Sequence, residues 1–409
     1  MLLAGQFKRL KAACAVAALG STVRAAEALH LSQSSVARAV QELEEALGQP
    51  LFERSGRGMR PAASAAQLLR RAARALNHLA HARPLTHRPL DAGLDWLSSR
   101  LALGAGQRHL QTMVLLAETA SETAAAQRMG ISQSAVHQRL VQLEHMAAVP
   151  LFVRARKGLR LTEAAEAVLK AAKLCLAELQ QAGDELLMRE GVVQGRIVIG
   201  TLPFSTGRLL AQTVDAVLRA YPGLNITIID GTYDALLHQL RHAEIDMVVG
   251  ALRPALPGPD LEQETLFIDR LAVMARAGHP LARRRKLGWH DLRDAQWVMP
   301  MPNTPAQAAF ERTLHAAGLP MPSSALRVNS ALMMLAVLAQ SDRLAMMAPR
   351  QLQREIEAGL LVELKLSVNH EPRMIGVIRR ADYLPTPAAH MLADTLREVA
   401  QAIAGTDDE

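Results

Sequence analysis

Two short runs of polar side chains, placed 100 residues apart, are the residues in this sequence best suited to recognising another molecule. The runs are Ser32, Gln33, Ser34 and Ser35 with Arg38, and Ser132, Gln133 and Ser134 with His137 and Gln138. Gln pairs bidentately with adenine, Arg with guanine, and Ser with several base edges, so these residue types suit the reading of DNA. A Ser before a helix is also a common N-cap, which leaves a purely structural interpretation open for each residue taken singly.

A group of basic residues follows each run. The basic residues are Arg54, Arg57 and Arg60 after the first run, and Arg154, Arg156, Lys157 and Arg160 after the second. Cations in this position suit contact with phosphates or with the minor groove. Lys and Arg outnumber Asp and Glu two to one over residues 1–100 and balance them over 101–409. The overall charge of +7 therefore resides in the N-terminal part, which favours a polyanion such as double-stranded DNA as the partner.

Both runs lie inside a longer repeat that predicts a small folded unit. The surrounding residues recur 100 positions later without a gap, Leu31–Val36 as Ile131–Val136 and Pro50–Arg54 as Pro150–Arg154. In the first copy, Ser32 can cap a helix over Gln33–Leu47 that has apolar residues on one face. We call this helix and its counterpart the reading helices. Two shorter helices before it and a hairpin after it predict a helix-turn-helix followed by a basic wing, present twice.

The two copies differ at the ends of their helices. Gly48 follows the first reading helix, where a left-handed C-cap favours glycine, but the second copy has Ala148 there. An alanine in that conformation costs about 1 kcal/mol. After the hairpin, the second copy has Leu161-Thr162, which suits the start of a helix, and the first has Pro61-Ala62. Each copy therefore lacks one local signal that the other keeps.

The rest of the chain predicts long helices and then an α/β domain. From residue 195 onward, runs of β-branched residues alternate with amphipathic stretches, which predicts a mostly parallel sheet with helices on its faces. The predicted boundaries are 1–60 for the first winged helix-turn-helix, 61–82 for its linker helix, 83–106 for a connector, 107–161 for the second unit, 162–190 for its linker helix and 193–405 for the α/β domain.

These motifs closely resemble those of LysR-type transcriptional regulators. The resemblance rests on Arg24–Val36 and Leu43–Arg54, on the matching residues of the second copy, and on Leu161–Ala165. It implies two winged helix-turn-helix domains followed by an effector-binding domain with the two-lobed α/β fold of type-2 periplasmic binding proteins. The lobes are expected at about 193–268 with 371–405 and at about 269–370. Residues 233–254 look most like the branch that contains the galactose-binding-protein regulator.

The resemblance also implies partners and an effector site. We expect double-stranded DNA, a small-molecule effector such as a sugar or a small organic acid, a homo-oligomer (dimer or tetramer), and RNA polymerase if the protein is an activator. The effector is expected to contact Thr201, Phe204, Ser205, Asn303, Thr304, Asn329 and Ser330. Free N–H groups at helix starts can hold an anion or a hydroxyl, although plain capping explains the Asn and Ser/Thr residues equally well. Phe204 suits the floor of the pocket and the hydrophobic core equally.

The linker helices carry a further expectation. In the resembled family such helices pair between subunits, and usual members have a single DNA-reading unit. Here the two linker helices, at 62–82 and 162–189, belong to one chain. We therefore hypothesise that they pair within the chain, which would make its N-terminal part a pseudo-dimer.

Several other classes of protein lack support. The apolar stretch Ala331–Ala339 is too short to cross a membrane, and no cleavage site follows the basic N-terminus. Cys14 and Cys175 form no motif, and no histidine spacing predicts a metal site. Nucleophile elbow, P-loop and dinucleotide patterns are missing, so we expect a cytoplasmic protein that is not an enzyme and needs no cofactor. The alternatives are a cytoplasmic small-molecule-binding protein whose N-terminal half serves assembly, and an enzyme on the binding-protein fold.

Overall fold

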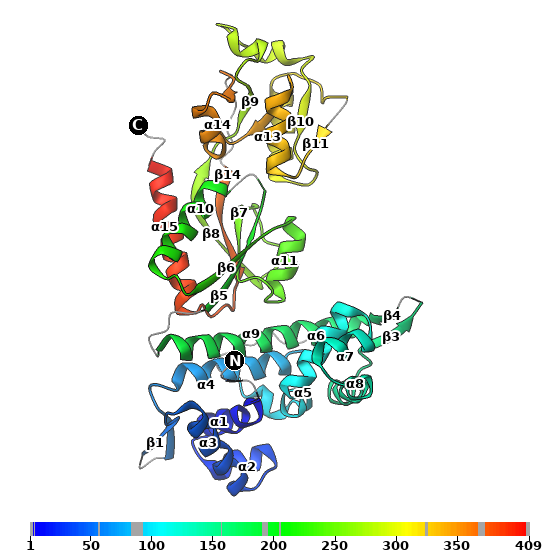
Figure 1. Cartoon of the computed structure of the whole chain (residues 1–409), viewed down its shortest axis with the longest axis vertical. Coiled ribbons are helices and arrows are strands. Elements are labelled where there is room, and N and C mark those ends of the chain that lie inside the picture. The colour runs from blue at the N-terminus through cyan, green and yellow to red at the C-terminus, as the bar shows by residue number, and fades with distance from the viewer. Residues whose placement is uncertain are drawn as a thin grey trace. The chain divides into compact units, whose positions relative to one another are not determined.

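The computed structural model describes residues 3, 5–55, 58–82, 93–156, 158–189, 195–203, 206–323, 326–366 and 373–405. The chain forms two compact units (Figure 1). Unit 1 holds Met1–Gly195 with Arg241–Glu244, and unit 2 holds Arg196–Leu240 with Ile245–Glu409. Within the described ranges, every helix is too short or too polar to span a lipid bilayer.

Unit 1 contains the repeat as two sets of elements with the same bounds, 100 residues apart. The first set is α1 (Phe7–Leu19), α2 (Thr22–Leu29), α3 (Gln33–Leu47), β1 (Phe52–Ser55) and β2 (Gly58–Pro61). The second set is α6 (Gln107–Thr119), α7 (Glu122–Met129), α8 (Gln133–Ala147), β3 (Phe152–Ala155) and β4 (Gly158–Leu161). The reading helices α3 and α8 span the residues that the sequence predicts. Their buried faces carry Val36, Val40 and Leu43 in α3, and Val136, Leu140 and Leu143 in α8.

The two long helices that follow the hairpins start differently. Helix α9 (Glu163–Arg189) begins directly after Thr162, whose Oγ1 accepts a hydrogen bond from the backbone N–H of Ala165 at 3.2 Å. Helix α4 (Ala66–Ala80) has no side-chain cap and begins three positions later in the repeat. The absence of a capping hydroxyl at Ala62 thus shortens the first linker helix, which was predicted from residue 62 onward.

Helices α4 and α9 pack along each other within unit 1, as Figure 1 shows. The hypothesis that the two linker helices pair within one chain is therefore confirmed. Their buried faces join the cores of both repeats into one continuous hydrophobic cluster. The segment between the repeats, with η1 (Asp95–Ser98) and α5 (Arg100–Gly104), packs on α4. The Lys11 ammonium of α1 binds this segment by donating hydrogen bonds to the carbonyls of Leu103 and Ala105 at 2.7 and 2.8 Å.

Unit 2 is built on two five-stranded sheets. One sheet has the order β6-β5-β7-β14-β8, and the other has the order β11-β10-β12-β9-β13. The strands of the first sheet are β5 (Gly195–Thr201), β6 (Leu224–Asp230), β7 (Met247–Ala251), β8 (Leu261–Asp269) and β14 (Arg373–Arg380). The strands of the second are β9 (Ala272–Arg276), β10 (Trp297–Met299), β11 (Leu326–Arg327), β12 (Leu344–Met347) and β13 (Leu361–Glu363).

Helices alternate with these strands. The helices of unit 2 are α10 (Gly207–Ala220), α11 (Tyr233–Arg241), α12 (Pro305–Ala316), α13 (Ala331–Gln340), α14 (Gln353–Glu357) and α15 (Pro387–Gly405), with 3-10 turns at Pro280–Arg283, Trp289–Leu292 and Pro349–Leu352. Both sheets are mixed, so the prediction of a mostly parallel sheet is confirmed only in part. Strand β5 is parallel to β7, but β14 runs antiparallel to both β7 and β8. In the second sheet, β9 is antiparallel to β12 and β13.

Candidate nucleic-acid interface

The first reading helix begins with exposed polar side chains on a capped helix start. Ser32 Oγ accepts a hydrogen bond from the backbone N–H of Ser35 at 3.1 Å, so Ser32 acts as the N-cap. It also lies within hydrogen-bonding distance of the hydroxyls of Ser34 and Ser35. Ser32, Gln33, Ser34, Ser35 and Arg38 are all exposed. The structure thus brings all five predicted residues onto the first two turns of one helix, where base edges can be reached.

Arg38 is held along the helix by an acidic neighbour. Its side chain is 81% exposed and its Nε lies 2.8 Å from the Glu42 carboxylate, which also pairs with Arg9 at 2.8 Å. Hydrogen bonds from Arg38 and Arg9 hold the pKa of Glu42 below its usual value. An exposed pair of this kind is worth little in free energy, so Arg38 can leave Glu42 for a base or a phosphate at small cost.

The second reading helix has the same cap but a different neighbour. Ser132 Oγ accepts from the backbone N–H of Ala135 at 3.2 Å. Ser132, Gln133, Ser134, His137 and Gln138 are exposed, as predicted for a reading surface. A carboxylate on α7, Glu122, lies 3.0 Å from Nδ1 of His137 and 3.4 Å from Nε2 of Gln133. In the first copy, Gln33 Nε2 meets the hydroxyl of Thr22 instead, at 3.5 Å.

Sequence reasoning missed Glu122, because its contact with His137 spans two helices and a turn. Partial burial alone would raise the pKa of Glu122, but hydrogen bonds from His137 and Gln133 outweigh it and lower that pKa. Glu122 is therefore charged at neutral pH. A negative charge beside the second reading helix opposes the approach of a phosphate, which the first copy avoids by having Thr22. The only sequence signal is the Thr-to-Glu difference between equivalent positions of the repeat.

Both wings are anchored by the same backbone contact. The backbone N–H of Met59 donates to the Gly20 carbonyl at 2.9 Å, and that of Leu159 to the Ala120 carbonyl at 2.7 Å. The side chains of Arg60, Arg154, Arg156 and Arg160 are exposed. Arg54 pairs with Met59 in the β1–β2 ladder, but its side chain, together with Arg57 and Lys157, lies outside the described residues. The described wing cations thus stand on hairpins tied to the turn after the first helix of each copy.

Several of the predicted effector residues of unit 2 make local contacts. Thr201, at the end of β5, is buried and its hydroxyl meets that of Thr206. Thr304 caps α12 by accepting from the backbone N–H of Gln307 at 3.2 Å, and Ser330 caps α13 by accepting from that of Met333 at 3.3 Å. Asn303 has a left-handed backbone, with φ 58°, and Asn329 is exposed. Phe204 and Ser205 lie outside the described residues.

Arg253 is a cation near these residues that sequence reasoning missed. It follows β7, and its guanidinium group lies over the Tyr233 ring, 3.7 Å from the ring centroid. Its Nη2 also donates to the backbone carbonyl of Asn303 at 3.4 Å. Because Asn303 directly precedes the cap of α12, Arg253 joins the end of a strand in the first sheet to the helix start beside the second sheet. No local pattern marks this contact, because the two residues are far apart along the chain.

Comparison with known proteins identifies both units. The family model for the LysR substrate binding domain matches residues 190–401. The model for the bacterial regulatory helix-turn-helix protein, lysR family, matches residues 7–66 and again residues 107–166. The HTH-type transcriptional regulator GalR of Pseudomonas putida is 34% identical over 398 residues, which is 96% of this chain and 96% of that protein.

Two further similar proteins are shorter than this chain. The regulator PcaQ of Agrobacterium fabrum is 27% identical, over 94% of its own length but 72% of this chain. The structure of full-length CbnR in complex with its target DNA has a TM-score of 0.52 and 18% identity, over 100% of that chain and 72% of this one. These two matches include nearly all of each shorter protein but leave over a quarter of this chain unmatched. The match to GalR covers 96% of this chain.

Proposed function

Because the chain belongs to the LysR family of bacterial regulators, we propose that its N-terminal unit contains two winged helix-turn-helix domains and that both bind DNA. Members of this family regulate transcription through a DNA-binding helix-turn-helix and an effector-binding domain, and this chain has both. One observation supports a double reader above all others. The two sets of elements, each with a capped and exposed reading helix and a basic wing, have the same bounds 100 residues apart.

The two reading helices are proposed to enter the major groove with their first two turns. Gln33 and Gln133, at equivalent positions, suit adenine, and Arg38 suits guanine. The exposed cations of the wings, Arg60 and Arg160 among them, suit the phosphates or the minor groove on either side. A regulator works in the compartment that holds the DNA, so the proposed location is the cytoplasm.

DNA binding is tested by replacing the reading residues one unit at a time. A DNA fragment is first selected from a random pool by the purified protein, and its Kd is then measured at two salt concentrations. Arg38→Ala is expected to weaken binding by about 1–3 kcal/mol, and Gln138→Ala, at the matching position, to weaken it as well. The matched control is Arg219→Ala. Arg219 is an exposed i,i+4 ion-pair partner on α10 in unit 2, 79% exposed against 81% for Arg38.

A footprint on the same fragment distinguishes one reader from two. If both winged helix-turn-helix domains read DNA, each variant should lose protection over the half of the site that its altered domain contacts and keep protection over the other half. If the Gln138→Ala footprint equals that of the unchanged protein, the second winged helix-turn-helix does not read bases. If both variants bind as tightly as the Arg219→Ala control, neither helix is a reading helix.

For the effector, we propose a small organic acid in preference to a sugar. The Arg253 guanidinium offers a fixed positive charge beside the Thr304 helix start, where a carboxylate is stabilised. A screen of organic acids and sugars by thermal shift, followed by calorimetry, tests this choice. The tightest acid found should lose at least about tenfold in affinity in Arg253→Gln, as expected for a lost charge-assisted hydrogen bond. Tight binding of a neutral sugar that is unaffected by Arg253→Gln would contradict the proposal.

A further inference from the structure

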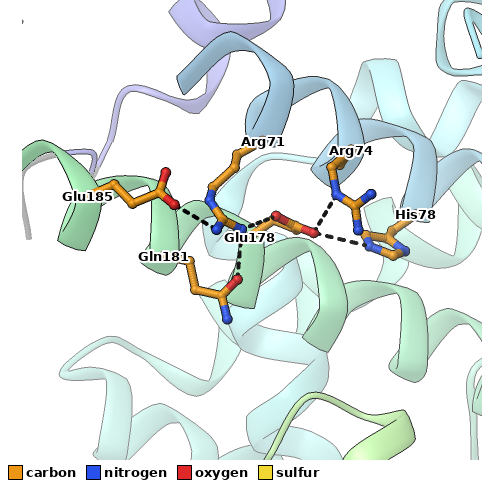
Figure 2. Close-up of polar contacts among 6 residues, drawn as sticks. All are labelled: Arg71, Arg74, His78, Glu178, Gln181 and Glu185. Atoms are coloured by element: carbon orange, nitrogen blue, oxygen red, sulfur yellow. Dashed lines mark hydrogen bonds and ion pairs between the residues drawn. The ribbon is translucent and has the colours of Figure 1, made fainter. Parts of the chain in front are cut away.

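The interface between the two linker helices contains a cluster of charged side chains with opposite signs on the two sides. Helix α4 contributes Arg71, Arg74 and His78, and helix α9 contributes Glu178, Gln181 and Glu185, as Figure 2 shows. Arg71 Nη1 donates to Glu178 Oε2 and to Gln181 Oε1, both at 2.9 Å. Arg71 Nη2 donates to Glu185 Oε1 at 2.7 Å. Arg74 Nε donates to the other oxygen of Glu178 at 2.9 Å, with His78 Nε2 3.8 Å away.

The cluster is buried, so each charge depends on its partner. Arg71 is 0% exposed and Arg74 5%, against 6% for Glu178 and 7% for Glu185. Burial alone would raise the pKa of Glu178, but the contact with His78 and the charges of Arg74 and Arg71 lower that pKa to about 2. A buried charge without a counter-charge is strongly destabilising. Such a cluster therefore discriminates between correct and incorrect partners more than it adds net stability.

The repeat shows that the charges are not shared by the two helices. The positions in α9 that match Arg71 and Arg74 hold Ala171 and Leu174, and the position in α4 that matches Glu178 holds His78. The facing surface of α4 is therefore cationic and that of α9 is anionic. Two copies of α4 brought together in the same way would place Arg74 against His78, without a carboxylate partner. Two copies of α9 would place Glu178 against Leu174, without a cation. Either pair would bury charges that lack counter-charges. Only the mixed pair has every charge matched.

The segment between the repeats keeps the matching helix of the same chain within reach. Asn77 Nδ2 of α4 donates to the Gly93 carbonyl at 2.9 Å, and His81 Nε2 lies 3.0 Å from Asp95. Lys11 then holds the carbonyls of Leu103 and Ala105, immediately before α6. The described part of the connector is thus fastened to the first repeat at both of its ends. The second repeat, with α9, starts from a point fixed on the first.

We propose that these six residues form a pairing code that closes α4 onto α9 of the same chain and excludes either helix from pairing with its own copy in a second chain. A single chain then presents both of its DNA-binding units as a fixed pair. Any larger assembly must form through surfaces other than this helix pair. The code is a property of the N-terminal unit alone, and its tests use no DNA, so their outcome is independent of the proposed function.

Chemical cross-linking tests which helices pair. In Arg71→Lys, a carbodiimide can join the introduced amine to a carboxylate in direct contact. We expect a link from position 71 to Glu178 or Glu185 in a product that keeps the denatured mass of one chain. Arg70→Lys, at an exposed position of the same helix, is the control and should give no link to either glutamate. A product with the mass of two chains joined through position 71, or no link to either glutamate, would overturn the proposal.

Charge reversal tests whether the charges carry the code, and it remains informative if the first variant folds poorly. One variant carries Arg71→Glu with Arg74→Glu, a second carries Glu178→Arg with Glu185→Arg, and a third combines all four changes. The first two are each expected to exchange amide hydrogens of α4 and α9 at least about 100-fold faster than the unchanged protein. The third should recover most of that protection within single chains.

Mixing gives the sharpest readout. When the first two variants are unfolded and refolded together, the reversed α4 of one matches the reversed α9 of the other, so protection should return in two-chain complexes. Arg70→Glu is the control and should leave exchange unchanged. Normal exchange in the first two variants, or no recovery in either the combined variant or the mixture, would show that these charges do not select the partner.

Discussion

The two repeats of unit 1 share their helices and strands and differ in the charges of some of their side chains. Their helices α1–α3 and α6–α8 and their hairpins have identical bounds at an offset of 100 residues. Each wing is hydrogen-bonded to the turn after the first helix of its own copy. The residues beside the reading helices differ in charge, with Thr22 in one copy and Glu122 in the other. The linker helices differ most, because the surface of α4 that faces α9 is cationic and the surface of α9 that faces α4 is anionic. The two copies thus agree in the elements that form the fold and differ in the charges on their surfaces.

Acidification should break the pairing of the linker helices before it affects the hairpins. Glu178 has its pKa lowered from 4.5 to about 2 in the folded chain. A carboxyl whose folded pKa is depressed contributes stability that is complete above its unfolded pKa and is lost as pH falls toward its folded pKa. Unit 1 should therefore lose about 3 kcal/mol between about pH 4.5 and pH 2 through this group alone.

Hydrogen exchange of α4 and α9, measured across this pH range, checks the expectation. Glu178→Gln should remove most of the pH dependence from these two helices, at the expense of stability at neutral pH. Glu118→Gln, which removes an exposed carboxylate paired with Arg128, serves as the control and should leave the pH dependence intact. An unchanged pH dependence in Glu178→Gln would assign the acid sensitivity to other groups.

The glycines that open the second strand of each wing should be equally intolerant of substitution. Gly58 has φ 117° and Gly158 has φ 113°, and a Cβ would lie 2.5 Å and 2.4 Å from the carbonyl oxygens of Gly20 and Ala120. Gly58→Ala and Gly158→Ala should each destabilise their repeat by about 1–3 kcal/mol and release the wing from the turn. Exchange of the amides of the two hairpins measures this release.

A control for the glycine substitutions is available in the same unit. Gly183 lies inside α9, and a Cβ there would meet nothing within 4 Å. Gly183→Ala should stabilise the helix by about 0.5–1 kcal/mol. If one wing tolerated alanine and the other did not, the two repeats would differ in the very contact that Gly58 and Gly158 share in the structure.

Exchanging the residues beside the reading helices should transfer DNA affinity between the units. Glu122→Thr removes a carboxylate next to Gln133 and His137, so the second winged helix-turn-helix should bind DNA about fivefold more tightly at low salt. Thr22→Glu should weaken the first unit by a similar factor. Kd values at two salt concentrations on one selected fragment check both changes. Tighter binding in Thr22→Glu would refute the assignment of a repulsive role to Glu122.

The features that sequence alone predicts here are local ones. Ser32 and Ser132 mark helix starts because an N-cap bonds to an N–H three residues ahead, and the repeat reveals itself by direct comparison. The missed features join residues that are distant along the chain. Arg71 contacts Glu178, which lies 107 positions later in the chain. Strand β14 returns from the far end of the domain's sequence to pair antiparallel with β7. Neither a hydrophobic period nor a motif encodes such contacts, so charges such as Arg253 and Glu122 look like ordinary surface residues until the fold is known.

The smallest expected effect comes from the C-caps of the reading helices. Ala148 has φ 55° and Gly48 has φ 65°, so both are left-handed and the predicted strain in the second copy is present. Ala148→Gly should stabilise the second repeat by up to about 1 kcal/mol, and Gly48→Ala should destabilise the first by a similar amount. A Cβ at Gly48 would meet nothing within 4 Å, so the loss there reflects backbone conformation alone. Glycine also gains entropy in the unfolded chain, which reduces the benefit at position 148. Amide exchange of α3 and α8 measures both changes, and effects of opposite sign and similar size would show that the two reading helices end in the same way despite different residues.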